Sequence, residues 1–397
     1  MRSIRVCRPR WSTKRAPRMR ETADVVVVGG GTTGCGIAWH LAQAGTNVRL
    51  LERADIAAGS SGASPGIVRL YYADPALVAL ASDGSHAYRH WSETVGGDCR
   101  FRRTGFLTAV APEDWNATHA YVDSLRSKGF ALSLLSVDDM RGLCSDIDAE
   151  GLAGAVYEAD AGYCDARASA LAFAHGARAS GAQIDTRCEV RGIRAQGGRV
   201  VGVDTDRGSI DCAVVVNAAG PWAARLAASC GVELPIAPSR QCVAIVRADD
   251  GGRASLPGFS DRRGGFYLRP DLPRHYFIGS LQASDSGAID VDGFDTRMGD
   301  AEQLRYRVRA ARRFARIDGA TPAGSRVSFF DDTPDGNPLF GADPRVQGLF
   351  VAAGLSGHGF KLAPVFGQGV ADWLETGRLR PELRAFDVMR FEKCALR

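Results

Sequence analysis

The chain has 397 residues, of which 45% are hydrophobic and 24% are charged, as in an ordinary globular protein of one or two domains. The formal net charge is +4, but the first 20 residues carry eight basic residues and no acid, so the rest has a net charge of −4. That acidic remainder argues against a nucleic-acid-binding protein. The ten cysteines form no Cys-x-x-Cys pair and no His–Cys cluster. We therefore expect no metal site and no disulfide framework, and a reducing cytoplasmic location.

The N-terminal segment is interpreted as a basic, disordered extension covering residues 1–21. It contains no apolar core, so it does not match a secretory signal. A transit-like segment, or a tail that binds nucleic acid or a partner, is the alternative. No apolar run approaches about 18–20 residues, so no membrane span is expected.

Residues 24–52 give the strongest local pattern in the chain. Val25–Val28 is a continuous β-branched run, as in a strand buried on both faces. A Gly-x-Gly-x-x-Gly turn follows, then a helical pattern to Gly45. A second predicted strand, Val48–Leu51, delivers Glu52 at its C-terminal end.

This order of strand, turn, helix, strand and acid predicts dinucleotide binding. Gly29 would permit the tight turn, Gly31 would let a pyrophosphate approach the backbone, and Gly34 would let helix and strand pack closely. The helix N-terminus stabilises phosphate charge, and Glu52 can accept hydrogen bonds from ribose hydroxyls. The motif alone does not separate FAD from NAD.

A second glycine-rich run lies near the other end of the chain. Gly354, Gly357 and Gly359 interleave with His358 and Lys361, and a helical pattern continues to Leu374. Such glycines let the backbone approach a flat ligand, and the helix N-terminus can stabilise the negative charge of a reduced flavin. An ordinary turn before a surface helix is the alternative.

The intervening chain predicts two domains of α/β (α+β) class. Val214–Val216 is expected to return to the central sheet, and Ala218–Gly220 to turn beside the cofactor. Residues 233–324 alternate short strands with Gly/Asp-rich turns, which indicates a mostly antiparallel sheet. Phe329–Gly341 is interpreted as a turn-dense return. We expect a discontinuous Rossmann-like cofactor domain (residues 22–84, 150–232 and 325–391) and a substrate domain (residues 85–149 and 233–324).

Four blocks together resemble one family. They are VVVVGGGTTGCG with Glu52, GSSGASPGIVR ending at Arg69, VVVNAAGPWA around Trp222, and TPDGNPLFG followed by GLSGHGFK ending at Lys361. Across residues 22–390 the chain resembles the D-amino-acid-oxidase-like FAD-dependent oxidoreductases, most closely the sarcosine oxidase and glycine oxidase branch.

This resemblance implies FAD as the cofactor. The loop at residues 59–64 has no histidine or cysteine for covalent attachment, so the FAD is expected to be non-covalent. The predicted cofactor-binding residues are Gly29, Gly31, Thr32, Thr33, Gly34, Glu52, Arg53, Ser60, Ser61, Gly62, Ala63, Ser64, Val190, Ala219, Gly220, Trp222, Gly354, Gly357, His358, Gly359, Phe360 and Lys361.

The resemblance also implies the residues that meet the substrate. The family arginine and lysine that hold a substrate carboxylate map onto Arg69 and Lys361. The arginine would bind the carboxylate as a bidentate donor, and the lysine would bind it as a point charge. Tyr267 falls where the family has a substrate-facing tyrosine, with a cross-strand aromatic as the alternative. His358 resembles the family histidine beside the flavin, with a structural histidine as the alternative.

Sarcosine oxidases resemble one another in a lysine above the flavin that helps to activate oxygen. The matching position lies near Phe277, and residues 233–324 contain no lysine. The predicted function is FAD-dependent oxidation of a small amino acid or N-methyl amine by hydride transfer, with O2 or another electron acceptor. A dehydrogenase or electron-transfer subunit that serves a quinone or partner protein, and an enzyme that modifies aminomethyl groups in tRNA, are the alternatives. The oligomeric state is left open.

Overall fold

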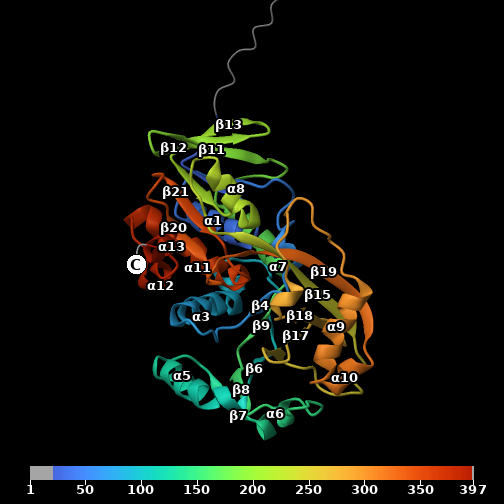
Figure 1. The fold of residues 1–397 in the computed structure, drawn as a ribbon. Coiled ribbons are helices and arrows are strands. Elements are labelled where there is room, and N and C mark those ends of the chain that lie inside the picture. Colours follow the sequence, from blue (N-terminus) through green and yellow to red (C-terminus); the bar gives the residue numbers. More distant parts are fainter. Residues whose placement is uncertain (1–20, 396–397) are drawn as a thin grey trace, which may run out of the picture.

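The computed structural model describes residues 21–395, so nearly all of the predicted basic extension lies outside the described part. The strands of the described part form sheets of six, eight, four and three strands. Figure 1 shows the four-stranded sheet at one end of the molecule and helices α5 (Trp115–Ser127) and α6 (Val137–Leu143) at the other. The molecule has two halves, one built on the six-stranded sheet and the other on the eight-stranded sheet.

The six-stranded sheet joins segments from both ends of the chain. β2 (Val25–Val28) pairs in parallel with β3 (Val48–Leu51) and β14 (Val214–Asn217), and β14 pairs in parallel with β21 (Leu349–Ala353). The predicted return of Val214–Val216 to this sheet is confirmed, because β14 lies between β2 and β21. In sheet order the strands are β10 (Gln183–Asp185), β3 (Val48–Leu51), β2 (Val25–Val28), β14 (Val214–Asn217), β21 (Leu349–Ala353) and β20 (Leu339–Ala342).

Alternate valines of β2 face opposite sides of the sheet, as the period of two in a strand requires. Val25 and Val27 pack in the hydrophobic cluster with the helices, whereas Val26 and Val28 pack in the cluster with the four-stranded sheet. The predicted burial on both faces is therefore confirmed. The helices are α1 (Thr32–Gln43), α3 (Pro75–Arg89), α7 (Ala166–Ala179) and α11 (Gly359–Thr376). The four strands are β1 (Glu21–Thr22), β11 (Val190–Gln196), β12 (Arg199–Thr205) and β13 (Gly208–Asp211).

The eight-stranded sheet is mostly antiparallel, as predicted, with one parallel pair between β6 and β16. One face carries a core that includes Phe266, Leu268 and Ile278, and α6, α9 (Asp300–Ala311) and α10 (Ala315–Asp318) lie on that side (Figure 1). The opposite face is turned toward the six-stranded sheet. In sheet order the strands are β19 (Thr321–Asp332), β15 (Ala237–Arg247), β18 (His275–Ser280), β17 (Phe266–Pro270), β16 (Gly258–Asp261), β6 (Phe106–Val110), β8 (Gly154–Glu158) and β7 (Ser133–Ser136).

The sequence interpretation was wrong about the start of the segment Phe329–Gly341. Its first residues are not a turn but the end of the twelve-residue strand β19, which pairs with β15 over its whole length. The polar residues there are satisfied across the strands, since the Ser239 hydroxyl donates to the Asp332 carboxylate. β8 and β19 both belong to the eight-stranded sheet, although the predicted boundaries at residues 150 and 325 placed them largely with the cofactor domain.

The remaining elements connect the two halves. A three-stranded sheet lies between them, and short helices follow turns in the half that contains the six-stranded sheet. No helix of the described residues is long and apolar enough to cross a membrane. These elements are α2 (Ser60–Ala63), β4 (Ile67–Val68), α4 (Trp91–Thr94), β5 (Arg102–Arg103), β9 (Gly162–Tyr163), α8 (Ala223–Ala228), α12 (Pro381–Arg384), α13 (Arg390–Ala395) and the 3-10 turns η1 (Pro112–Asp114), η2 (Gly220–Trp222) and η3 (Ala283–Asp285).

Candidate active site

Two adjoining cavities lie between the six-stranded and eight-stranded sheets. The larger, of about 840 Å³, runs past the C-terminal ends of β2 and β3, and we call it the groove. The smaller, of about 310 Å³, lies beside β17 and the start of α11, and we call it the chamber. Ser60, Phe329 and Leu355 are among the residues that line both. The two cavities are therefore neighbouring parts of one site.

The glycine turn at the groove has the conformation that the motif predicts. Gly29 has φ +111°, and a Cβ there would lie 2.3 Å from the carbonyl oxygen of Ala218. A Cβ on Gly34 would lie 1.9 Å from the carbonyl oxygen of Gly29. Both positions therefore exclude any side chain.

The N-terminus of α1 lies where the two cavities meet, because Gly31 lines the groove, Thr32 lines the chamber and Thr33 lines both. Its N-cap, Gly31, provides no side-chain cap, and the Thr32 N–H donates to Ser61 Oγ at 2.9 Å. The Thr32 hydroxyl is buried and has no hydrogen-bond partner. A helix N-terminus of this kind stabilises phosphate charge, so the residues present fit the pyrophosphate of a dinucleotide.

Glu52 lies at the end of β3 and lines the groove. Its Oε2 accepts a hydrogen bond from the Gly30 N–H at 2.6 Å, and its Oε1 accepts one from the Ala54 N–H at 2.7 Å. The carboxylate is thus fixed in place by the glycine turn and by its own loop. Its remaining lone pairs can accept further hydrogen bonds, and contact with a ribose stays a prediction.

The rim of the groove is held by a group of paired charges. Asp292 accepts hydrogen bonds from Trp222 Nε1 at 2.9 Å, from Arg225 at 2.6 Å and from Arg53 at 3.2 Å. The Arg53 guanidinium lies 4.3 Å from the centroid of the Trp222 ring. The hydrogen bonds from Trp222 and Arg225 lower the pKa of Asp292 to about 2. The cations at this rim therefore have a partner within the protein.

The chamber brings together all four residues predicted to meet the substrate. Arg69 follows β4, Tyr267 lies on β17, and His358 and Lys361 lie at the start of α11. Tyr72 also lines the chamber. These segments are almost 300 residues apart in the sequence and meet because both sheets close around the same space.

Arg69 and Lys361 lie near one aromatic ring. The Arg69 guanidinium is 4.1 Å and the Lys361 Nζ is 5.4 Å from the centroid of Tyr72. Arg69 also donates to the carbonyl of Tyr71, and Lys361 Nζ donates to the carbonyl of Gly357 at 3.4 Å. Burial and the nearby Arg69 lower the pKa of Lys361 to about 7.

A buried carboxylate, Glu158 on β8, lies behind these cations. Its side chain is 2% exposed, Oε2 accepts from the Leu70 N–H at 2.5 Å, and Oε1 has no hydrogen-bond partner. Burial raises the pKa of Glu158, while Arg69 opposes that shift. Glu158 was not predicted from the sequence, because a single glutamate in a strand gives no distinguishing pattern.

His358 and Tyr267 are both held in their neutral forms. Burial, then Lys361 and Arg69, lower the pKa of His358 well below its usual value, and its Nδ1 is buried without a partner. Burial raises the pKa of Tyr267 to about 12. Its ring covers Gly279 on β18, where a Cβ would lie 2.1 Å from Tyr267 Cζ. The glycine thus makes room for the tyrosine on the chamber face.

Near Phe277, where the sequence lacks the expected lysine, the structure has two arginines. The guanidinium of Arg269 lies 3.9 Å, and that of Arg326 4.6 Å, from the centroid of the Phe277 ring. Arg326 lines the chamber. It was missed because β19 was not recognised as a strand that faces this space.

Most of the predicted cofactor-binding residues line the groove or the chamber, but three glycines do not. Gly34 and Gly62 lie behind the lining, where a Cβ on Gly62 would be 2.2 Å from the carbonyl oxygen of Ala57. Gly354, with φ +61°, serves the turn before α11. The predicted residues that do line the cavities are Gly29, Gly31, Thr32, Thr33, Glu52, Arg53, Ser60, Ser61, Ala63, Ser64, Val190, Ala219, Gly220, Trp222, Gly357, His358, Gly359, Phe360 and Lys361.

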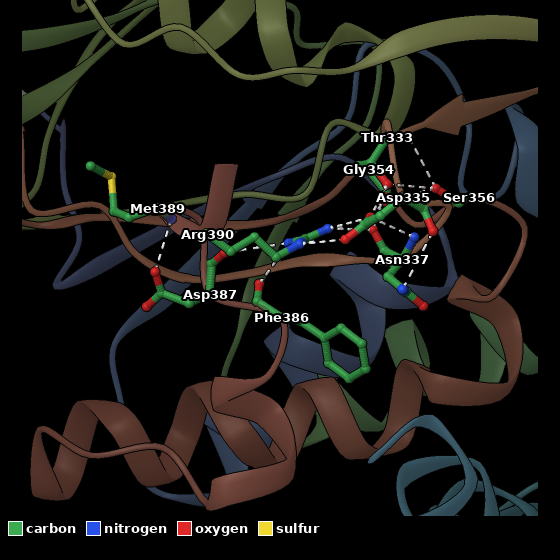
Figure 2. A network of polar contacts seen from close by, with 9 residues as sticks. All are labelled: Thr333, Asp335, Asn337, Gly354, Ser356, Phe386, Asp387, Met389 and Arg390. Carbon is green, nitrogen blue, oxygen red and sulfur yellow. Dashed lines mark hydrogen bonds and ion pairs between the residues drawn. The ribbon is translucent and has the colours of Figure 1, made fainter. Parts of the chain in front are cut away.

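A polar network holds the turn before α11 in place, and Figure 2 shows its members. The Thr333 N–H donates to Ser356 Oγ at 3.1 Å, and the Thr333 hydroxyl donates to the carbonyl of Asn337 at 2.7 Å. Arg390 donates to both carboxylate oxygens of Asp335, at 2.8 and 2.9 Å. The start of α13 therefore fixes the loop that supports the chamber.

Comparison with known proteins identifies the family of the chain. The family model described as FAD dependent oxidoreductase (DAO) matches residues 24–373. A glycine oxidase from Geobacillus kaustophilus is 28% identical over 94% of this chain and 98% of its own, and a crystal structure of glycine oxidase from that organism superposes with a TM-score of 0.82, covering 93% of this chain and 99% of that one.

Two further proteins are similar over nearly the whole chain. The 4-methylaminobutanoate oxidase (formaldehyde-forming) of Paenarthrobacter nicotinovorans is 30% identical over 92% of this chain but 45% of its own. The chain spans less than half the length of that relative. The L-proline dehydrogenase from P. horikoshii has the same fold, with a TM-score of 0.87 at 24% identity over 95% of this chain and 99% of that one. The chain belongs to the DAO family of FAD-dependent oxidoreductases.

Proposed function

We propose that the protein oxidises a small amino acid, or a secondary N-methyl amine, that carries a carboxylate. The observation that carries this proposal is the position of Arg69 and Lys361 in the chamber. Both cations lie near the Tyr72 ring, and within residues 21–395 neither forms an ion pair with a carboxylate. A substrate carboxylate would supply the missing partner, with Arg69 as a bidentate donor and Lys361 as a point charge.

The residues around the two cations suit an amine that reacts without its proton. Tyr72 and Tyr267 line the chamber and are neutral at ordinary pH, because burial raises the pKa of each to about 12. Their rings exclude water and disfavour a substrate ammonium by desolvation. His358 adds no positive charge, since its imidazole is neutral.

Bound FAD would supply the redox chemistry, by accepting a hydride from the C–H beside the nitrogen and leaving an imine that hydrolyses in water. The chain would orient that C–H by holding the carboxylate at one end of the chamber. The N-terminus of α11, which has no side-chain cap, would stabilise the negative charge that develops on the ring system.

Transfer of electrons to a partner protein or a quinone is the second candidate for the oxidative half of the reaction. The observation that favours it is that residues 233–324 contain no lysine, although the family lysine that helps to activate oxygen would match a position near Phe277. Relatives of both kinds occur, since the named proteins include an oxidase of glycine and a dehydrogenase of proline.

The test is anaerobic reduction of the purified, flavin-loaded protein by glycine, sarcosine, proline and D-amino acids. We expect at least one amine with a carboxylate to bleach the flavin absorbance. Re-admission of air then separates the two candidates, because rapid re-oxidation with formation of peroxide identifies an oxidase. Protein that is colourless and that releases no flavin on denaturation would overturn the proposal.

A further inference from the structure

Arg326 faces the chamber because of its register in β19. Its cross-strand neighbour is Val243 on β15, which also lines the chamber. The next residue, Val327, packs against the core on the opposite face. This alternation is the ordinary period of a strand, and it directs the Arg326 side chain toward the chamber.

The Arg326 guanidinium has only weak partners within the protein. Nη1 donates to the carbonyl of Ser64 at 3.2 Å, and the group lies near the Phe277 ring. No ion pair of Arg326 with a carboxylate is found in residues 21–395. Most of its donors therefore remain available to a ligand.

The neighbouring Arg269 is satisfied. It contacts the same Phe277 ring at 3.9 Å but donates to Asp271 at 2.7 Å and to the carbonyls of Pro65 at 2.6 Å and Pro270 at 2.7 Å. One arginine is thus used to hold the loops together, while the other faces an open space. A structural role explains Arg269 but leaves the exposed donors of Arg326 unexplained.

The chamber as a whole has an excess of positive charge. Three cations line it, Arg69, Lys361 and Arg326, against one lining carboxylate, Asp331, and the buried Glu158 behind Arg69 and Lys361. Asp331 is 7% exposed and one of its oxygens has no hydrogen-bond partner. One substrate carboxylate bound between Arg69 and Lys361 would leave the remaining donors of Arg326 without a carboxylate.

We infer that the natural substrate carries two acidic groups: one carboxylate would bind between Arg69 and Lys361, and Arg326 would bind the second. The substrate class is an amino acid with an acidic side chain, or a secondary amine with a carboxylate on each arm. This inference rests on the proposed function and specifies its substrate. A contact of Arg326 with the bound cofactor is the competing explanation.

The experiment uses carboxylates that cannot be oxidised, so that binding is measured without turnover. Calorimetric titration of the flavin-loaded protein compares malonate, succinate and glutarate with propionate, butyrate and pentanoate. We expect at least one dicarboxylate to bind about tenfold or more tightly than its monocarboxylate of equal length, since charge-assisted hydrogen bonds are the strong ones. Arg326→Gln should remove that preference and leave monocarboxylate affinity within about twofold.

Two variants control for other effects. Arg326→Lys keeps the charge and should retain part of the preference. Arg247→Gln removes an exposed arginine from the neighbouring strand β15 and should change nothing. Flavin content and melting temperature are measured for every variant, so that a folding defect is recognised.

Equal affinity for dicarboxylates and monocarboxylates in the wild-type protein would overturn the inference. So would an Arg326→Gln protein that weakens both ligand classes alike, or that loses flavin, because that result assigns Arg326 to the cofactor. Failure of the proposed function gives a different pattern: a preference for dicarboxylates with no amine that reduces the flavin.

Discussion

The groove and the chamber adjoin one another, but they differ in whether their charged side chains have partners within the protein. At the groove, Arg53 and Arg225 share Asp292, and both Glu52 oxygens accept backbone hydrogen bonds. In the chamber, the cations form no ion pair within residues 21–395, and Asp331 Oδ2 and His358 Nδ1 are buried without a hydrogen-bond partner. The difference suggests that the cofactor groove is shaped by the chain alone, whereas the chamber is completed by the molecule that it binds.

This contrast has an energetic consequence. Unpaired buried charges cost several kcal/mol each, a cost that a ligand of opposite charge offsets on binding. Substitutions in the groove should therefore act through sterics and cofactor retention. Substitutions in the chamber should act through substrate affinity and its dependence on pH.

The largest effect is expected from a substitution that disrupts the glycine turn at the groove. Gly34→Ala puts a methyl group 1.9 Å from the carbonyl oxygen of Gly29, so the turn must move. We expect loss of flavin retention together with a clear drop in melting temperature. The matched control is Gly142→Ala in α6, where no atom lies within 4 Å of the new Cβ. That variant should gain up to about 1 kcal/mol in the free energy of unfolding. Normal flavin content in Gly34→Ala would refute the steric account.

The next largest effect is expected from a substitution that removes a cation from the chamber. Arg69→Gln removes the bidentate donor and leaves Glu158 with less compensation, so we expect kcat/KM for a substrate with a carboxylate to fall about 100-fold or more. The flavin spectrum should be unchanged, which separates the two regions. Arg102→Gln, at an exposed arginine of β5, is the control and should keep full activity. A loss of flavin in Arg69→Gln would contradict the division between groove and chamber.

A pH titration sharpens the same comparison. The pKa of Lys361 is about 7 in the free protein, so its ammonium is present below pH 7 and is lost as the pH rises. Affinity for a monocarboxylate such as propionate should fall by up to roughly tenfold per pH unit above 7.

The measurement is calorimetry between pH 7 and 9, where Asp331, with a pKa of about 6, is mostly ionised. Lys361→Met should bind propionate more weakly at pH 7 and lose this pH dependence. An unchanged slope in Lys361→Met would assign the titration to another group.

The smallest expected effect concerns the loop that supports the chamber. Arg390→Ala removes the two hydrogen bonds to Asp335, and we expect a loss of about 1–3 kcal/mol in the free energy of unfolding, with a small change in kcat. A double-mutant cycle with Asp335→Asn isolates the pair. Arg378→Ala, at an exposed residue after α11, serves as the control. Additive effects in the cycle would show that the network does not couple the two residues.

The sequence predicted the parts of the site that depend on local backbone geometry. Gly29 and Gly34 were recognised because a tight turn between a strand and a helix needs glycine at that spacing. Arg69, Tyr267, His358 and Lys361 were named from a resemblance to a family, and the structure brings them to one chamber. Their roles toward a substrate remain predictions.

The residues that were missed depend on contacts between segments far apart in the chain. Glu158 is significant only because burial places it behind Arg69, and no local pattern reveals that position. Arg326 was missed because no strand was predicted around it, and the strand character of β19 comes from pairing with β15. Long-range pairing overrides local preference in such cases.

The position of β14 between β2 and β21 has a consequence for synthesis. β2 and its glycine turn emerge from the ribosome early, but β21 and α11 follow more than 300 residues later. Until then the nascent chain has an open sheet edge beside β14 and only part of the flavin site. Cofactor loading should therefore be a late event, and an incomplete chain exposes a strand edge that is prone to aggregation.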